Sequence, residues 1–157
     1  MKIVLIQTGK TTDRNVAAIA ELYETRISRY NPFGIITIPD IRYAASLPVQ
    51  EQKAREGEKI MKSLSEDDYL VLLDERGAEL RTADFANWLQ KSLMMSKKRI
   101  VFAIGGPWGF PEAVYGRADT KISLSRMTFP HQLVRLLFLE QLYRAFTILR
   151  GEPYHHE

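Results

Sequence analysis

The sequence predicts an α/β fold in which a mostly parallel sheet is flanked by helices. Four short runs rich in β-branched residues have the length of buried strands, and segments with helical periodicity lie between them. Strands that alternate with helices are typical of a parallel sheet, because each crossover helix covers one of its faces. A chain of 157 residues has the size of one domain, so we expect a single domain over residues 1–157.

The expected elements follow one another in the order βαβαβαβ. Strands are predicted at 3–6 (IVLI), 35–38 (IITI), 69–73 (YLVLL) and 100–104 (IVFAI). Asp13 is the expected cap of a first helix, whose apolar residues recur every three to four positions from Val16 to Ile27. Charged helices are expected at 51–64 and 82–95, and the stretch 39–48 is expected to be a loop. A glycine-rich loop, a short helix, a short strand at 121–124 and a long final helix complete the chain.

The final helix is apolar in nearly every direction between residues 133 and 149. A helix of this kind is buried on more than one side, and a second copy of the chain is a natural partner for its second side. His131, Arg135, Glu140 and Arg144 interrupt the apolar pattern. Glu140 and Arg144 have the spacing of an intrahelical ion pair, which is the simplest explanation for those two residues.

Composition excludes several classes of function. The chain has no cysteine, which rules out disulfides, thiolate metal sites and cysteine nucleophiles. No apolar run is long enough to span a bilayer, and the start MKIVLIQTGK is interpreted as a strand and not as a signal peptide. We therefore expect a cytoplasmic protein without membrane contact. A net charge of +3 and a pI near 9.2 weakly favour a polyanionic partner.

Ligands of open α/β sheets bind at the carboxyl ends of the strands, where three segments of this chain are expected. One of the three, 105–110 (GGPWGF), has neither the P-loop spacing nor the dinucleotide-binding fingerprint. Pro107 also removes an amide that a phosphate cradle would use, so phosphate binding is disfavoured. Two interpretations stay open: a tight turn, or close backbone approach to a flat uncharged ligand such as adenosine.

A second segment, 73–77 (LDERG), places two carboxylates after a buried strand. Asp74 and Glu75 are expected to point in opposite directions, because neighbouring side chains alternate on extended backbone. A solvated turn closed by Gly77 is the favoured interpretation. Binding of a ligand hydroxyl or cationic group by one of the carboxylates is the alternative.

The third segment, 123–130 (SLSRMTFP), leads into the final helix. Pro130 is predicted to be the first residue of that helix, with Thr128 as a local cap. Ser125 is a conceivable nucleophile with His131 as its base, but the G-x-S-x-G motif is absent and a hydrolase is disfavoured.

The chain ends in GEPYHHE, for which two interpretations compete. Gly151 and Pro153 stand where a helix is terminated, and a frayed end would then follow. Alternatively, Tyr154 stacks on an RNA base while His155 and His156 donate to phosphate. Two adjacent histidines without a third ligand do not predict a metal site.

The segments LLDERG, IGGPWGF and SLSRMTFPHQLVRLLFLEQLYRAFTILRGEPYHHE together resemble the ribosomal RNA large-subunit methyltransferase H family. The resemblance covers the whole chain. It implies a SPOUT-type, S-adenosylmethionine-dependent enzyme with a trefoil-knotted α/β fold that acts as a homodimer. It further implies methylation of N3 of pseudouridine 1915 in helix 69 of 23S rRNA, within the large subunit or the intact ribosome.

The resemblance also implies roles for individual residues. Arg144 is expected to stabilise the deprotonated base and His155 to be a candidate general base, with no metal. The expected RNA contacts are His131, Arg135, Tyr154 and His156, and the expected cofactor contacts are Leu73, Gly106, Ser125, Arg126, Met127, Thr128, Phe129 and Pro130.

The sequence is also compatible with two other functions. A non-catalytic ribosome-binding or assembly factor would have the same fold without turnover. A nucleotide-dependent α/β enzyme would bind ATP or NAD, which the strand-end loops do not favour.

Overall fold

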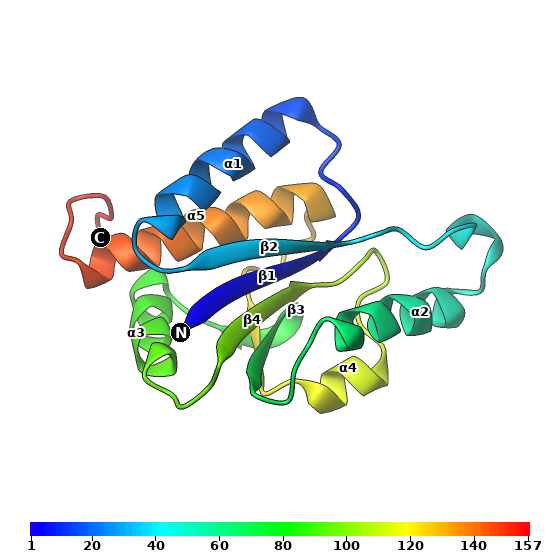
Figure 1. Cartoon of the computed structure of the whole chain (residues 1–157). Coiled ribbons are helices and arrows are strands. Elements are labelled where there is room, and N and C mark those ends of the chain that lie inside the picture. The colour runs from blue at the N-terminus through cyan, green and yellow to red at the C-terminus, as the bar shows by residue number, and fades with distance from the viewer.

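The structure confirms the predicted α/β fold with a parallel sheet flanked by helices (Figure 1). It is a computed structural model that describes residues 1–157. Its elements are β1 (Lys2–Thr8), α1 (Arg14–Ser28), β2 (Phe33–Ile38), the 3₁₀ helix η1 (Ala44–Ser46), α2 (Val49–Lys62), β3 (Asp68–Glu79), α3 (Thr82–Leu93), β4 (Arg99–Ile104), α4 (Glu112–Arg117), β5 (Thr120–Ser123) and α5 (His131–Leu149).

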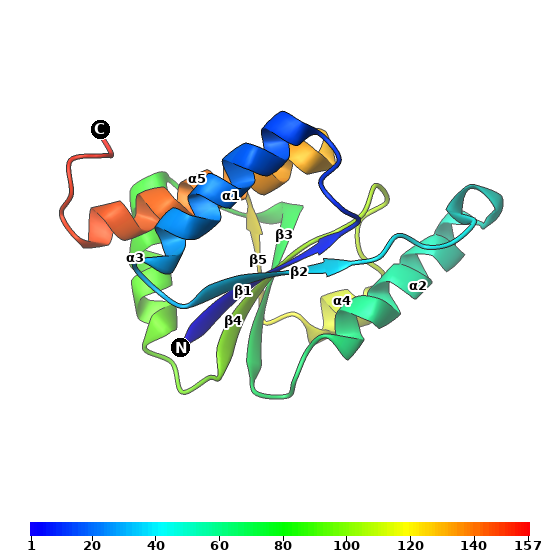
Figure 2. The ribbon, with the colours of Figure 1, turned by 45° about the horizontal axis from the view of Figure 1, so that its top comes forward.

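The five strands form one sheet in the order β2-β1-β4-β3-β5, and every neighbouring pair is parallel. Helices α1, α3 and α5 cover one face, and α2 and α4 cover the other (Figures 1 and 2). All strands therefore end at the same edge of the sheet, which is where ligands of open α/β sheets bind. None of the helices combines the length and apolar character that crossing a membrane demands.

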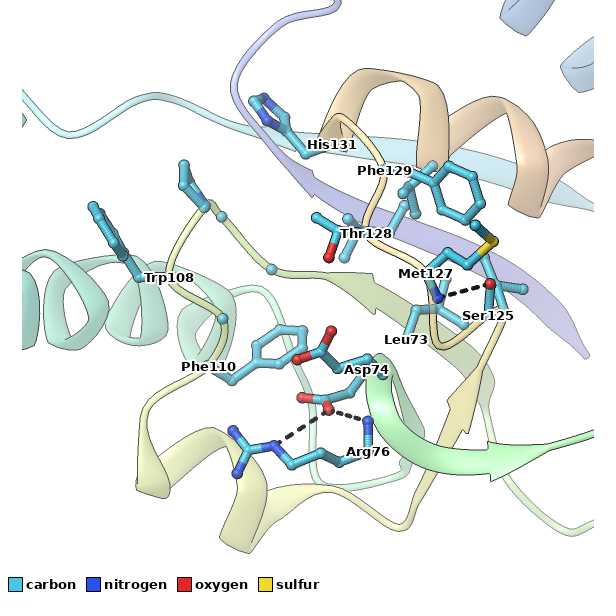
Figure 3. Close-up of a pocket in the computed structure, with 18 of the residues that line it drawn as sticks. Leu73, Asp74, Arg76, Trp108, Phe110, Ser125, Met127, Thr128, Phe129 and His131 are labelled. Carbon is cyan, nitrogen blue, oxygen red and sulfur yellow. Dashed lines mark hydrogen bonds and ion pairs between the residues drawn. The ribbon is translucent and has the colours of Figure 1, made fainter.

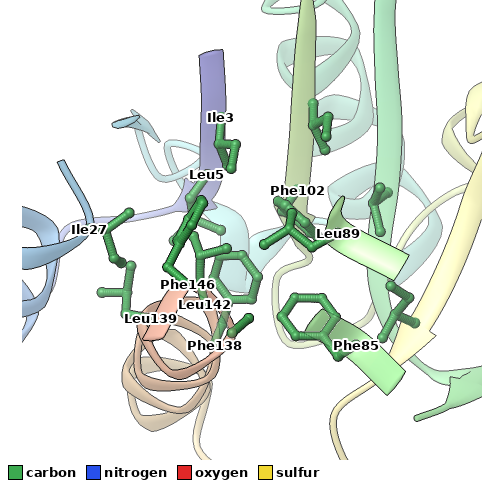
Figure 4. Packing of buried hydrophobic residues seen from close by; sticks show 14 of the residues in the cluster. Ile3, Leu5, Ile27, Phe85, Leu89, Phe102, Phe138, Leu139, Leu142 and Phe146 are labelled. Carbon is green, nitrogen blue, oxygen red and sulfur yellow. The ribbon is translucent and has the colours of Figure 1, made fainter. Parts of the chain in front are cut away.

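Alternate residues of the strands feed two separate cores. Ile3 and Leu5 of β1 face the larger core below α1, α3 and α5 (Figure 4). Val4 and Ile6 face the smaller core below α2 and α4. This alternation follows from the two-residue period of a strand. Because both faces are covered, the strands are nearly continuous apolar runs, which makes them recognisable in the sequence.

Helix α5 lies between α1 and α3 on its face of the sheet. Its buried residues pack on the sheet below, and the two flanking helices contact it on either side; Phe138, for example, lies 4.7 Å from Phe102 of β4, measured between ring centres. Its own chain buries this helix on three sides. The second copy of the chain that is expected to cover another side of it stays a prediction.

Strand β3 is longer than predicted and includes the whole LDERG segment. The pairing of β3 with β5 shifts register between Leu73 and Ala78, so the chain bulges there and then resumes its ladder. A Cβ at Gly77 would lie 2.6 Å from the backbone nitrogen of Ile122. Gly77 therefore permits close approach of two strands, and the predicted solvated turn closed by Gly77 is wrong.

The ends of two helices test the predicted caps. Asp13 caps α1 as predicted, since its carboxylate accepts from the backbone N–H groups of Asn15 (2.8 Å) and Val16 (3.1 Å). Helix α5, in contrast, begins at His131, so that Pro130 is its N-cap residue and not its first helical residue. No side chain caps α5, which contradicts the cap predicted for Thr128.

A buried ion pair joins β3 and β4 at their amino ends. The Arg99 Nε donates to Oδ1 of Asp68 at 2.8 Å, and the backbone N–H of Ser65 donates to the second carboxylate oxygen at 2.8 Å. Asp68 is fully buried. Burial alone would raise the pKa of its carboxyl group, but the hydrogen bonds from Arg99 and Ser65 outweigh burial and lower that pKa.

A buried guanidinium joins α5 to the carboxyl end of β1. Arg135 is 2% exposed; its Nη2 donates to the carbonyl oxygen of Thr8 at 2.5 Å and its Nη1 to Oγ1 of Thr11 at 3.0 Å. Burial lowers the pKa of the guanidinium, and the negative charge of Asp40 opposes that shift. A side chain enclosed in this way cannot reach RNA, so the predicted RNA contact of Arg135 is wrong.

We expect Asp68→Asn to lower the free energy of unfolding at pH 7 by about 2–3 kcal/mol, because Arg99 loses its charged partner. The Asp68 pKa is depressed in the folded protein, so this stability is present above the unfolded pKa of about 3.9 and is lost as pH falls through the folded value. Urea unfolding measures the difference in the free energy of unfolding between wild type and Asp68→Asn. This difference should be smaller at pH 3.5 than at pH 7. Asp67→Asn, at an exposed neighbouring position, is the control. The same difference in the free energy of unfolding at both pH values would contradict the prediction.

We expect Arg135→Lys to lower the free energy of unfolding by about 1–3 kcal/mol, because an ammonium group cannot replace the planar fork that reaches both threonines. Arg126→Lys makes the same chemical change on a side chain that is 83% exposed and should cost less than about 0.5 kcal/mol. Chemical denaturation of both variants provides the comparison. Equal losses would show that the two hydrogen bonds of Arg135 add nothing to stability.

Candidate functional site

The three strand-end segments meet around one cavity at the carboxyl edge of the sheet (Figure 3). Its volume is about 320 Å³, within the range of small-molecule sites. The residues that line it come from the ends of β3, β4 and β5 and from the start of α5. They are Leu73, Asp74, Glu75, Arg76, Ile104, Gly105, Gly106, Pro107, Trp108, Gly109, Phe110, Tyr115, Leu124, Ser125, Met127, Thr128, Phe129, His131 and Val134.

Most of the predicted cofactor contacts lie on the wall of this cavity, namely Leu73, Gly106, Ser125, Met127, Thr128 and Phe129. Two do not. The Arg126 guanidinium points to Glu79, with which it forms an exposed ion pair. Pro130 is the N-cap residue of α5 and is not part of the lining. The structure therefore assembles the three predicted segments but separates these two residues from the others.

Hydrogen bonds within residues 123–127 fix the segment that follows β5. The Ser123 hydroxyl donates to the carbonyl oxygen of Ser125 at 3.0 Å, and the Met127 N–H donates to Oγ of Ser125 at 3.0 Å (Figure 3). The Ser125 hydroxyl thus acts as a hydrogen-bond acceptor that shapes the loop. It has no hydrogen bond with His131, so the contacts give a serine nucleophile no support.

The glycine-rich loop after β4 is a tight turn. The Gly109 N–H donates to the carbonyl oxygen of Gly106 at 3.1 Å, and Gly109 has a positive φ of 80°. Trp108 stands at the turn and is 53% exposed at the rim of the cavity. A Cβ at Gly106 would meet the carboxylate of Glu56, which lies behind the loop. The group nearest to a side chain at position 106 would thus be a carboxyl group outside the cavity, and close approach of the Gly106 backbone to a ligand stays a prediction.

Asp74 forms a hydrogen bond that the sequence did not reveal. Its carboxylate accepts from the Tyr115 hydroxyl and, at 2.8 Å, from the backbone N–H of Arg76. Burial, followed by the hydrogen bond to Asp74, raises the pKa of Tyr115 to about 12. Tyr115 therefore remains a neutral donor that holds Asp74 in place. It lies 41 residues from Asp74, and only the fold brings them together.

The chemistry of the lining suits a cationic ligand without phosphate. Asp74 and Glu75 supply two carboxylates against the single guanidinium of Arg76, and no lysine is present. Phe110 and Phe129 supply apolar walls. No cluster of side chains in the molecule has the composition of a metal site. The structure thus favours an organic ligand held by apolar contacts, backbone groups and carboxylates.

The C-terminal tail folds back on α5 and is not frayed. The Tyr154 ring stacks on Tyr143 with the ring centres 4.8 Å apart, and the Arg144 guanidinium lies 4.6 Å from the centre of the Tyr154 ring. Arg144 Nε also donates to Glu140 at 2.9 Å, and its Nη1 lies 3.3 Å from Nδ1 of His155. The predicted Glu140–Arg144 pair is therefore confirmed, but as part of a larger cluster.

This tail cluster lies at the opposite end of α5 from the cavity. His131 lines the cavity, whereas Arg144 follows it by 13 residues, or about 20 Å along a helix. His156 is exposed beyond the cluster. Within one chain, the predicted catalytic pair Arg144 and His155 is thus separated from the predicted cofactor contacts.

Comparison with known proteins agrees with this geometry. Residues 1–155 match the family model described as "Predicted SPOUT methyltransferase". Proteins named ribosomal RNA large subunit methyltransferase H are similar over nearly their full length. That of Parabacteroides distasonis is 51% identical over 100% of both chains, and that of Christiangramia forsetii is 48% identical over 99% of both.

Among solved structures, the tRNA (m1G37) methyltransferase of Aquifex aeolicus has a similar fold. The likeness has a TM-score of 0.52 at 17% identity and covers 100% of this chain and 75% of that one. The similar fold and the full-length matches agree with a cavity whose loops lack a phosphate-binding motif. The chain belongs to the SPOUT family of methyltransferases that act on ribosomal RNA of the large subunit with S-adenosylmethionine as the cofactor.

Proposed function

We propose that this enzyme binds S-adenosylmethionine in the cavity at the carboxyl edge and methylates N3 of pseudouridine 1915 in helix 69 of 23S rRNA, within the large subunit or the intact ribosome. The observation that carries the cofactor site is the meeting of three strand-end segments, none with a phosphate-binding motif, around one cavity. The choice of base follows from the resemblance to the methyltransferase H family.

The residues on the wall fit the parts of this cofactor. Leu73, Phe110 and Phe129 provide apolar surface for an adenine ring, and the carboxylates of Asp74 and Glu75 complement positive charge. When bound, the cofactor supplies an activated methyl group for in-line displacement. The protein then has to hold the two reactants in line and exclude other nucleophiles.

The complete site is proposed to form between two copies of the chain. The cavity and the Arg144 cluster are about 20 Å apart in one chain, too far for one substrate base to touch both. Two-fold pairing in which α5 helices run in opposite directions would bring the cavity of one protomer to the tail of its partner. Exposed apolar side chains on α1, Ile19 and Leu22, are available for such a contact. We further expect the trefoil knot implied by the resemblance.

Arg144 has the properties expected of a group that stabilises a deprotonated imide. Hydrogen bonding to Glu140 raises its pKa, so the guanidinium stays cationic. Burial, followed by a hydrogen bond with Tyr23, raises the pKa of Tyr154 to about 12, which keeps that phenol neutral near pH 7. We propose Arg144 as the electrostatic group and His155 as the general base. His131, Tyr154 and His156 remain the proposed RNA contacts.

We expect Thr128→Trp to weaken S-adenosylmethionine binding at least tenfold, because Thr128 lines the cavity without any hydrogen bond and an indole there would fill it. Arg126→Trp, two residues away on an exposed side chain outside the cavity, should stay within about threefold of wild type. Calorimetric titration with the cofactor measures both. A greater loss at Arg126 would place the cofactor on the other side of the loop.

We expect Arg144→Lys to retain cofactor binding and lose at least about tenfold in methylation of unmethylated ribosomes, about 1.4 kcal/mol of transition-state stabilisation. Lysine keeps the charge but not the planar fork. Single-turnover assays with labelled cofactor should include Glu140→Gln. Equal losses in the two variants would indicate a structural pair only. Cofactor binding without methylation by wild type would favour a non-catalytic ribosome-binding factor.

Mixed dimers extend this test to the shared site. A one-to-one mixture of Thr128→Trp and Arg144→Lys chains leaves half of the dimers mixed, each with one intact cavity facing one intact tail. Methylation should then recover to about a quarter of the wild-type level after the chains exchange. No recovery would contradict a site formed between protomers.

A further inference from the structure

Glu56 is a buried carboxyl group for which the proposed reaction has no role. It lies on α2 and is 8% exposed, and its Oε2 is enclosed without any hydrogen-bond partner. Leaving a buried polar atom unpaired destabilises the folded protein, so such an atom needs an explanation. An apolar residue would be the cheaper choice if this position only filled space.

The carboxyl group lies directly behind the glycine-rich loop of the cavity. A Cβ at Gly106 would be 2.8 Å from Oε1 and 2.9 Å from Cδ of Glu56, closer than real Cβ contacts. The backbone of Gly106 is outside the left-handed region, so alanine is compatible with its conformation. The Glu56 carboxyl group is therefore the obstacle to a side chain at position 106.

The next residue of α2 touches the other end of the same loop. A Cβ at Gly57 would lie 3.1 Å from Cδ of Pro111 and 3.3 Å from Cγ2 of Val114. Two consecutive residues of α2 thus contact the loop at its start and just beyond its end. Gly57 holds the helix backbone against Pro111, and the carboxyl group of Glu56 is enclosed, so it has little open space into which it could withdraw from Gly106.

The carboxyl group of Glu56 acts on the loop and not directly on a ligand. Burial is the largest cause that raises the pKa of Glu56, the negative charge of Asp40 raises it further, and the positive charge of Lys59 opposes both. Glu56 itself is not among the residues that line the cavity. Its carboxyl group can therefore act on a ligand only through the backbone of the loop.

We propose that Glu56 is a positioning residue that sets the place of the Gly106 backbone and thereby the wall against which S-adenosylmethionine binds. The inference rests on the proposed cofactor site. It assigns α2, which contributes no residue to the cavity, an indirect part in cofactor affinity.

The test is a cycle of four full-length proteins: wild type, Gly106→Ala, Glu56→Ala and the double variant. Each is titrated with S-adenosylmethionine by calorimetry, and thermal unfolding is recorded in parallel. Gly106→Ala should bind at least fivefold more weakly, because the new methyl group pushes the loop from the carboxyl group. The double variant should recover at least half of the affinity lost in Gly106→Ala, measured as the logarithm of Kd. The reason is that the methyl group added at position 106 enters the space that the Glu56 side chain vacates. Strictly additive losses, or wild-type affinity in Gly106→Ala, would overturn the inference.

Two further variants separate shape from charge and from general damage. Glu56→Gln keeps the shape and should bind within about threefold of wild type, whereas a loss equal to that of Glu56→Ala would overturn the steric mechanism. Glu58→Ala, on the exposed side of the same helix, should bind as wild type does. Lack of cofactor binding by wild type would instead refute the cofactor site on which the inference rests. Unchanged affinity across the cycle, with normal binding by wild type, would refute only the role of Glu56.

Discussion

The burial of α5 between α1 and α3 is the constraint on which the rest of the molecule depends. This helix begins at the cavity, crosses the larger core and ends at the tail, so its placement fixes all three at once. The guanidinium of Arg135 anchors its first half to the end of β1 through Thr8 and Thr11. A helix held along its whole length cannot shift without disturbing both the cavity and the tail cluster, which lie about 20 Å apart.

The cavity is built from backbone more than from reactive side chains. Its loops are shaped by internal hydrogen bonds, by a glycine of positive φ at Gly109 and by support from outside, where Glu56 lies behind Gly106. The side chain that holds Asp74 in place, Tyr115, is itself kept neutral by burial and by their hydrogen bond. Rigid walls of this kind favour catalysis by positioning, since methyl transfer from a sulfonium requires alignment of the reactants more than acid–base assistance.

The tail shows how local interpretation of ionisable residues can be incomplete. Arg144 does pair with Glu140, as the helical spacing predicts, but it also covers Tyr154 and contacts His155. The pair is one part of a cluster in which the Arg144 guanidinium contacts the Glu140 carboxylate and the rings of Tyr154 and His155. Such a cluster orders the last residues of the chain and presents them as a surface, whereas an isolated helical pair would leave the tail free.

Local patterns in the sequence were sufficient to predict the α/β class, most strand positions, the cap at Asp13 and the three strand-end segments, because apolar strands and capping residues are local features of the chain. Tertiary packing, in contrast, was needed to establish that β3 continues to Glu79, that Arg135 is enclosed, and that α5 is buried by its own chain. The contacts of Tyr115 with Asp74 and of Glu56 with Gly106 also required it. Both contacts join groups at least 41 residues apart in the chain, and no local pattern records which distant surfaces will meet.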